Sequence, residues 1–175
     1  IYIDREGGRK MKVLIYRPKG RRSAPQTGVL WIHGGGYLTG FAAMAGLLGM
    51  GKRLVRRHGC VVISPAYRLW RGGRYPHALE DCYSALLYMA VLARGLGIRT
   101  DQIFVGGESA GGGLSAALCQ LARDRGQVRI AYHMPLYPMI DDRDTDSSRD
   151  NHNLGWNTVS NHFGWKVYLG ELYGT

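Results

Sequence analysis

One serine has neighbours that suit a catalytic nucleophile. Ser109 is the centre of Gly107-Glu108-Ser109-Ala110-Gly111, a G-x-S-x-G pattern between an expected strand and an expected helix. A serine that must project from a sheet on a strained turn needs residues without side chains two positions away on either side. The helix that follows would direct its free N–H groups and the positive end of its dipole at the site, which suits a developing oxyanion.

A second glycine-rich motif follows another expected strand. His33-Gly34-Gly35-Gly36-Tyr37 comes directly after residues 28–32. Three consecutive glycines leave main-chain N–H groups unobstructed, and an oxyanion hole built from backbone donors requires such groups. Chance would produce about 0.02 matches of this kind in the chain. Because ligands of open α/β sheets bind at the carboxyl edge of the strands, we expect both motifs to serve a site there.

Alternating strands and helices must position these motifs. An antiparallel hairpin of residues 1–4 and 11–16 is expected first, joined by Glu6-Gly7-Gly8-Arg9. Strands are then predicted at 28–32, 61–63, 102–105 and 130–136, and helices with a core-facing apolar stripe at 78–93 and 110–123. Residues 141–165 are polar and are expected to form a cap or insertion, followed by a short aromatic helix over 165–173. The pattern predicts a single α/β domain over 1–175, with a mostly parallel sheet and helices on both faces.

With these motifs, the sequence resembles the hormone-sensitive-lipase-like family of α/β-hydrolases, the branch of bacterial esterases and arylacetamide-deacetylase-type enzymes marked by HGGG and G-[DE]-S-A-G-G. Further matches follow in the family's order: Tyr16-Arg17-Pro18, Tyr67-Arg68-Leu69, Tyr75-Pro76, Gly111-Gly112-Gly113, Tyr137-Pro138, and Trp165 with Tyr168-Leu169-Gly170. The resemblance implies the α/β-hydrolase fold and a serine carboxylesterase that hydrolyses small, uncharged acyl esters through an acyl-enzyme. It implies no metal and no cofactor.

The resemblance also assigns roles to single residues. Ser109 matches the nucleophile, and the backbone donors of the oxyanion hole are matched by Gly35, Gly36 and Ala110. His33 matches the histidine that, with Gly34, shapes the glycine loop and is not the catalytic base. Glu108 stands where many relatives have aspartate; we interpret it as an orienting group, with a direct acid/base role as the alternative. One departure is Trp70-Arg71-Gly72-Gly73, where relatives commonly have Ala-Pro-Glu, which leaves the anchoring of that loop in question.

A serine nucleophile needs a base and a carboxylate that orients the base. In this fold both follow the serine, acid first, and in the resembling family both lie beyond the Trp-x-x-Tyr-Leu-Gly segment. The chain is therefore expected to be truncated before the last strands of the fold and to lack both groups. The alternative inside the chain is an acid among 141–150 with His152 or His162. We interpret the remaining histidines, His58, His77 and His133, as structural.

Composition narrows the function classes. The net charge is +10, but the basic residues are spread along the chain and accompany no nucleic-acid-binding motif, so no nucleic acid partner is expected. The longest apolar run, residues 85–93, is too short to cross a bilayer. Three scattered cysteines exclude a disulfide scaffold and favour a reducing, cytoplasmic location. The acidic residues of 141–150 lack the spacing of an EF-hand calcium loop.

Two other function classes stay open. One is a non-catalytic, ligand-binding relative that keeps the pocket and has lost the base. The other, suggested by charge alone, is a binder of anionic polymers. The expected partner is a small ester substrate, and association into a homo-oligomer is left open.

Overall fold

The computed structural model describes residues 1–5, 7–20, 24–47 and 49–175. Six strands among them form one sheet in the order β1-β2-β4-β3-β5-β6. Their bounds are β1 (Tyr2–Asp4), β2 (Lys10–Tyr16), β3 (Gln26–Ile32), β4 (Val61–Pro65), β5 (Ile98–Glu108) and β6 (Tyr132–Leu136). The last four are mutually parallel, whereas β1 and β2 form the antiparallel hairpin and β2 is also antiparallel to β4. The predicted mostly parallel sheet is confirmed; Glu6 of the hairpin connection lies outside the described residues.

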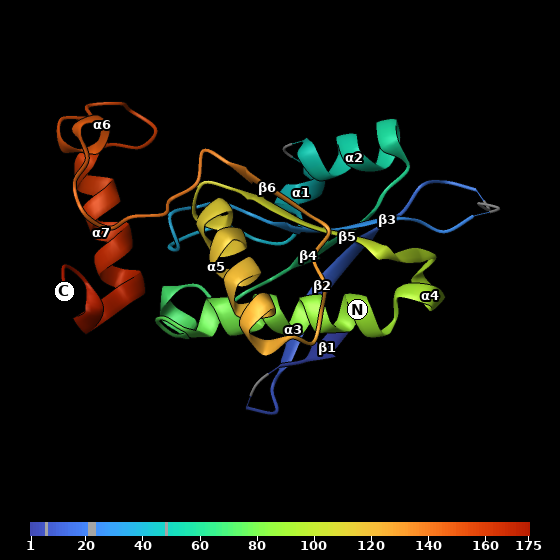
Figure 1. Cartoon of the computed structure of the whole chain (residues 1–175). Coiled ribbons are helices and arrows are strands. Elements are labelled where there is room, and N and C mark those ends of the chain that lie inside the picture. Colours follow the sequence, from blue (N-terminus) through green and yellow to red (C-terminus); the bar gives the residue numbers. More distant parts are fainter. Residues whose placement is uncertain (6, 21–23, 48) are drawn as a thin grey trace.

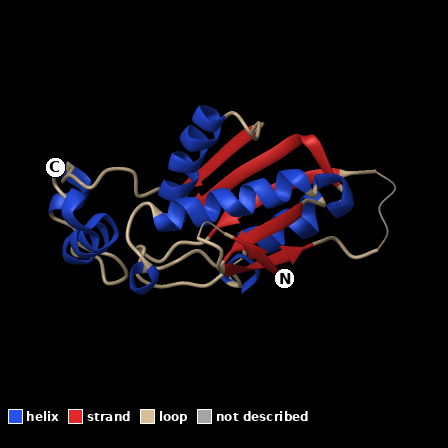
Figure 2. Cartoon of the chain, turned by 90° about the horizontal axis from the view of Figure 1, so that it is seen from below, coloured by secondary structure: helices blue, strands red, loops and turns tan. Residues whose placement is uncertain are grey.

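Helices lie on both faces of this sheet (Figure 1). The helices of the described residues are α1 (Met44–Leu47), α2 (Met50–His58), α3 (His77–Val91), α4 (Ala93–Leu96), α5 (Ala110–Arg125), α6 (Asp146–Arg149) and α7 (Thr158–Leu169), with 3-10 turns η1 (Trp70–Gly72) and η2 (Gly170–Leu172). One face of the sheet is covered by α3 and α5, and the other by α1 and α2. Figure 2 shows α6 and α7 at one end of the molecule, beside the sheet rather than over it.

Strand β3 lies inside the sheet and is buried on both faces. Leu30 and Ile32 pack into the core formed with α3 and α5, whereas Val29 and Trp31 pack towards α2. Successive side chains of a strand point to opposite faces, so a strand that is covered on both sides requires an unbroken apolar run. This explains why residues 28–32 could be assigned from sequence.

The predicted helices are found, with altered ends. The four apolar positions of the 78–93 stripe are all buried: Leu79, Cys82, Leu86 and Met89. The predicted start of the aromatic helix at Trp165 is wrong, because α7 begins at Thr158. Asn157 caps it by accepting a hydrogen bond from the backbone N–H of Ser160 at 2.9 Å. The predicted 130–136 strand begins two residues later, at Tyr132.

The loop at 70–73 is anchored despite its departure from the family pattern. The backbone N–H of Trp70 donates to the carbonyl of Tyr37 at 3.3 Å. Just before it, Arg68 donates from Nε and Nη2 to the two carboxylate oxygens of Asp81, at 3.0 and 2.8 Å. Asp81 is fully buried and also accepts from Arg5, at 3.1 Å. A buried carboxylate is tolerated when paired in this way, and here it joins the loop to α3.

Candidate active site

Ser109 lies on a strained turn between β5 and α5. Its backbone has φ 54° and ψ −121°, a conformation that residues with a side chain rarely adopt. Three hydrogen bonds of 3.0 Å hold it there: its N–H donates to Leu136, and its carbonyl accepts from Gly113 and Met139. The prediction of a sharp strand-to-helix turn at this serine is confirmed.

The glycines on either side of Ser109 are required by close backbone packing. A Cβ atom on Gly107 would overlap the backbone of Gly111, and one on Gly111 would overlap the carbonyl oxygens of Ile32 and His33. The start of α5 is therefore pressed against the carboxyl end of β3. Substituents at either position would push the nucleophile turn away from the sheet.

The glycine loop that follows β3 lies directly beside Ser109. A Cβ atom on Gly34 would be 2.8 Å from the carbonyl oxygen of Glu108 and 3.3 Å from the Cβ of Ser109. Gly35 and Gly36 have φ values of 117° and 60°, which glycine adopts without strain. The two motifs predicted to meet at the carboxyl edge of the sheet do meet there.

Three backbone N–H groups near Ser109 have no acceptor within the part of the chain that the structure describes. They belong to Gly35, Gly36 and Ala110, none of which donates from its backbone to a described residue. Ala110 is the first residue of α5, so its N–H is one of the free donors at the N-terminal end of that helix, where the helix dipole is positive. These are the groups that sequence assigned to the oxyanion hole.

His33 is buried and its contacts hold the glycine loop. Its Nδ1–H donates to the carbonyl of Gly34 at 2.8 Å, and its ring stacks on Tyr67 with centroids 4.3 Å apart. The hydroxyl of Tyr67 donates in turn to the carbonyl of His33 at 2.8 Å. Burial lowers the pKa of His33, although the Gly34 hydrogen bond and the charge of Glu108 oppose this. The imidazole is thus held neutral, and it is directed at the loop backbone.

Both carboxylate oxygens of Glu108 are engaged. The indole N–H of Trp31 donates to one at 3.2 Å, and the hydroxyl of Tyr137 donates to the other at 2.9 Å. Glu108 therefore links β3, β5 and the segment after β6 immediately beside Ser109. This geometry supports the orienting interpretation over direct acid/base chemistry.

A cavity of about 690 Å³ opens at Ser109. Most of its wall comes from the chain after β6, including Met139, Trp156 and Trp165 and the amide side chains of Asn157 and Asn161. Trp156 lies against the glycine loop, because a Cβ atom on Gly36 would overlap its ring. Sequence did not indicate this contact, which joins residues far apart in the chain.

The histidines considered as an internal base lie elsewhere. His162 pairs with Asp144 and His152 with Asp150, each at 2.7 Å, and neither histidine borders the Ser109 cavity. His133, in β6 as expected, contacts the buried hydroxyl of Ser115 at 2.9 Å. The hydroxyl of Ser109 makes no hydrogen bond to any described residue. A separate question is metal binding. The described residues contain no group of three or more His, Cys, Asp or Glu side chains that could hold a metal ion.

Comparison with known proteins identifies the family. A family model for the alpha/beta hydrolase fold matches residues 29–174. The chain belongs to this family, the hormone-sensitive-lipase-like esterases. Arylacetamide deacetylase of Oryctolagus cuniculus is 35% identical over 146 residues, which are 79% of this chain and 36% of that protein. An arylesterase of Saccharolobus solfataricus is 32% identical over 131 residues, or 75% of this chain and 41% of that protein.

Solved esterase structures superpose on this chain over nearly its whole length. A bacterial heroin esterase matches with a TM-score of 0.91 and 35% identity, covering 99% of this chain and 55% of that structure. An esterase of Pyrobaculum calidifontis matches with a TM-score of 0.89 and 29% identity, covering 98% and 56%. The chain thus spans about half the length of these structures and less of the curated relatives. No helix among its described residues is long and apolar enough to cross a membrane.

Proposed function

We propose that Ser109 is the nucleophile of a serine carboxylesterase that hydrolyses small, uncharged acyl esters. One observation carries the proposal: a serine on a strained turn stands beside three backbone N–H groups that have no acceptor among the described residues. Strain is retained where the surrounding structure enforces it, commonly at functional sites. The relatives, which include an arylesterase and a heroin esterase, support the same reaction class.

The proposed reaction starts with attack of the Ser109 hydroxyl oxygen on the ester carbonyl carbon, as a base takes the hydroxyl proton. The carbonyl oxygen becomes an alkoxide, which accepts hydrogen bonds from Gly35, Gly36 and Ala110. Donors fixed in advance stabilise this charge more than they stabilise the substrate, and this difference lowers the barrier. The bond from the carbonyl carbon to the alcohol oxygen then breaks as the base returns its proton to that oxygen, and water, activated by the same base, hydrolyses the acyl-enzyme to release the acid and restore Ser109.

In this proposal the nucleophile and the donors are Ser109, Gly35, Gly36 and Ala110, and no described histidine lines the Ser109 cavity. We therefore propose that the whole protein supplies the base from residues other than those of this chain. The chain spans about half the length of the solved esterase structures, which is in keeping with this proposal. The lack of a described histidine at this cavity also favours a second candidate function, in which the protein is a non-catalytic relative that binds ligands in the cavity. Ester turnover separates the two.

A fluorophosphonate probe tests the nucleophile, applied to the complete product of the gene that encodes this chain. We expect a single labelled residue, Ser109, and complete loss of labelling in Ser109→Ala. Ser147→Ala is the matched control, because Ser147 borders the same cavity and should leave labelling unchanged. Labelling that persists in Ser109→Ala would exclude the proposed nucleophile.

The rate at which the complete gene product hydrolyses p-nitrophenyl acetate tests the location of the base and the second candidate function. His152→Ala and His162→Ala should each retain the parental rate, since both histidines pair with surface carboxylates away from the cavity. Loss of turnover in either variant would identify an internal base instead. A parental protein that does not turn over ester at all would favour the non-catalytic relative.

A further inference from the structure

A second cavity lies apart from Ser109, on the side of the sheet that carries α1 and α2. It is a groove of about 790 Å³ between the end of β2 and these two helices, and it shares no lining residue with the Ser109 cavity. Tyr16, at its β2 end, pairs with Val62 near the start of β4. The groove thus lies towards the amino ends of the parallel strands, whereas Ser109 follows a carboxyl end.

Apolar and basic side chains both line the groove. Ile15, Val55 and the exposed Leu47 supply apolar surface. Four cationic side chains border it, two beside β2 and two on α2: Arg17, Lys19, Lys52 and Arg56. Sequence suggested that the basic residues are spread, but folding gathers these four, from two separate segments, around one cavity.

These four cations lack anionic partners within the described part of the chain. No ion pair with a described carboxylate involves any of them, and none of the described Asp or Glu residues lines the groove. Uncompensated charges of one sign around a concave, low-dielectric surface concentrate anions there. The apolar side chains of the lining add a preference for a ligand with a hydrocarbon portion.

From this arrangement we propose that the groove binds a free, single-chain anionic amphiphile, with a long-chain carboxylate as the model compound. The alkyl chain lies on Ile15, Leu47 and Val55, and the carboxylate is held by Lys52 and Arg56. The volume lies within the range of small-molecule pockets. Concavity favours one enclosed chain over a membrane surface, for which a projecting apolar face would be needed. The proposal does not depend on the function of Ser109.

Titration of the complete product of the gene that encodes this chain with dodecanoate, kept below its micellar concentration, tests the binding by calorimetry. We expect saturable binding of one molecule, weakened by added salt. Dodecan-1-ol and dodecyltrimethylammonium should bind at least about tenfold more weakly, since they lack the charge-assisted contacts. Octanoate should also bind more weakly, by up to about fourfold per methylene removed. Equal binding of all these compounds would overturn the proposal.

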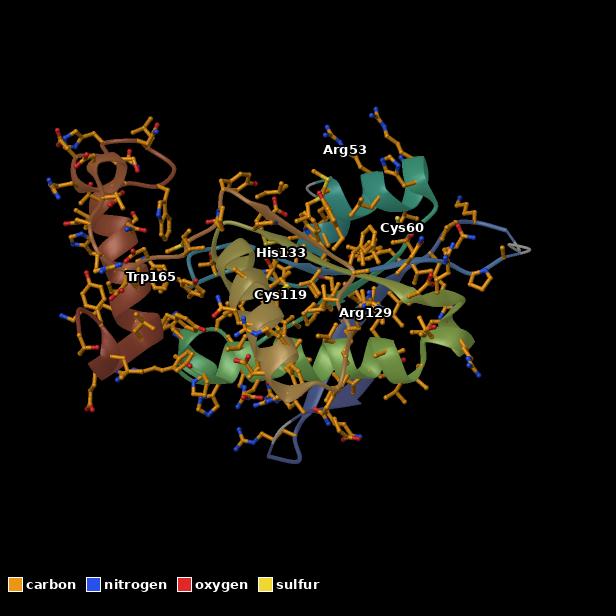
Figure 3. All side chains as sticks on the ribbon, viewed as in Figure 1. Arg53, Cys60, Cys119, Arg129, His133 and Trp165 are labelled. Carbon is orange, nitrogen blue, oxygen red and sulfur yellow. The ribbon has the colours of Figure 1, made fainter. Side chains whose placement is uncertain are left out.

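One helix provides a matched pair of variants. Lys52→Gln/Arg56→Gln removes two charges that border the groove, and Arg53→Gln/Arg57→Gln removes two exposed charges with the same spacing that do not. Figure 3 shows Arg53 extending from α2 away from the sheet. The first double variant should weaken dodecanoate binding about tenfold and the second should leave it within about twofold. Equal losses would show diffuse attraction to a basic surface and would overturn the proposal.

Two further measurements locate the ligand. Ser109→Ala should bind dodecanoate as the parent does, and loss of binding would place the ligand in the Ser109 cavity instead. Vesicles of anionic phospholipid should not bind the chain more strongly than free dodecanoate does. Binding to vesicles without binding of free dodecanoate would assign the groove to a membrane surface and refute the proposal.

Discussion

The glycines around Ser109 meet two different steric requirements. Gly107 and Gly111 are needed because backbone atoms of neighbouring elements occupy the space where a Cβ would lie. Gly35 and Gly36 are needed because their φ values are positive, and each also lacks room for a side chain. At Gly35 the obstacle is the backbone of Thr39, whereas at Gly36 it is the ring of Trp156. Only the last obstacle can be removed by a second substitution.

This difference allows a rescue experiment on the oxyanion loop. In the complete gene product, Gly36→Ala should lower kcat about 100-fold with a smaller change in KM, because the new methyl group displaces the loop from Trp156 and misaligns its N–H donors. Gly36→Ala/Trp156→Ala should recover kcat to within about tenfold of Trp156→Ala alone, with the remaining deficit due to backbone strain. Steady-state kinetics on p-nitrophenyl acetate measures both. A Gly36→Ala enzyme with unchanged kcat would contradict the assigned role.

The positions of Ser109 and the glycine loop could be predicted from the sequence, because local backbone requirements decide which residue types can stand there. A nucleophile turn needs glycine two positions away, and a strand end that presents N–H groups needs several in a row. The residues that contact Glu108 and Gly36 could not be predicted, because these contacts do not depend on local sequence. Trp31 and Trp156 approach them only through tertiary packing, which no spacing along the chain encodes.

Helix α7 is fastened to the same glycine loop. Tyr168 stacks on Tyr37, which follows the loop, with ring centroids 4.0 Å apart and an interplanar angle of 6°. The carbonyl of Tyr168 also accepts a hydrogen bond from the backbone N–H of Tyr75 at 2.8 Å. The wall of the Ser109 cavity and the glycine loop therefore share one aromatic anchor.

Removal of that anchor should loosen α7. Tyr168 is 7% exposed, so Tyr168→Ala should cost about 3–5 kcal/mol of stability and raise hydrogen exchange across 158–169. Phe163→Ala on the same helix is the control, since Phe163 is 53% exposed and should cost below about 1 kcal/mol. Urea unfolding and exchange mass spectrometry give the two readouts. Equal effects of the two variants would show that the Tyr37 stack does not hold α7.

Strands and buried helices could be predicted better than the surface helices. The 28–32 and 61–63 runs are apolar because both faces of the sheet are covered, and α3 shows a regular buried stripe. By contrast, α2 is only nine residues long and buries only Gly51 fully, and four basic residues separate or follow the apolar Met50, Leu54 and Val55 that pack on the core. In α7 the first turn is polar, and its start is encoded only by the Asn157 cap.

Across the whole molecule, charge is distributed less evenly than the sequence suggests. The acidic residues of 141–150 lie in the segment that leads to α7, whereas α2 and the end of β2 form the basic groove. Between these regions, the buried polar or charged side chains of the described residues are His33, Ser64, Asp81 and Ser115. Two histidines within or beside the core, His33 and His133, have pKa values that burial lowers.

Stability should therefore fall as the pH drops below about 6.5, the ordinary histidine pKa. Between that value and the lowered native pKa, the unfolded chain binds protons that the folded chain excludes, so the free energy of unfolding rises with pH and levels off above about 7. Each such histidine contributes a slope of at most about 1.4 kcal/mol per pH unit. Urea titrations from pH 5 to pH 8 measure the slope.

His33→Asn should reduce the slope, because its side-chain amide can still donate to the Gly34 carbonyl but does not titrate. His152→Asn is the control: His152 is exposed and its replacement should leave the His33 contribution in place. A parental slope unchanged by His33→Asn would mean that the loop opens before the core unfolds, so that His33 takes up its proton in a state that is still folded. The buried imidazole would then report on local opening of the oxyanion loop rather than on global stability.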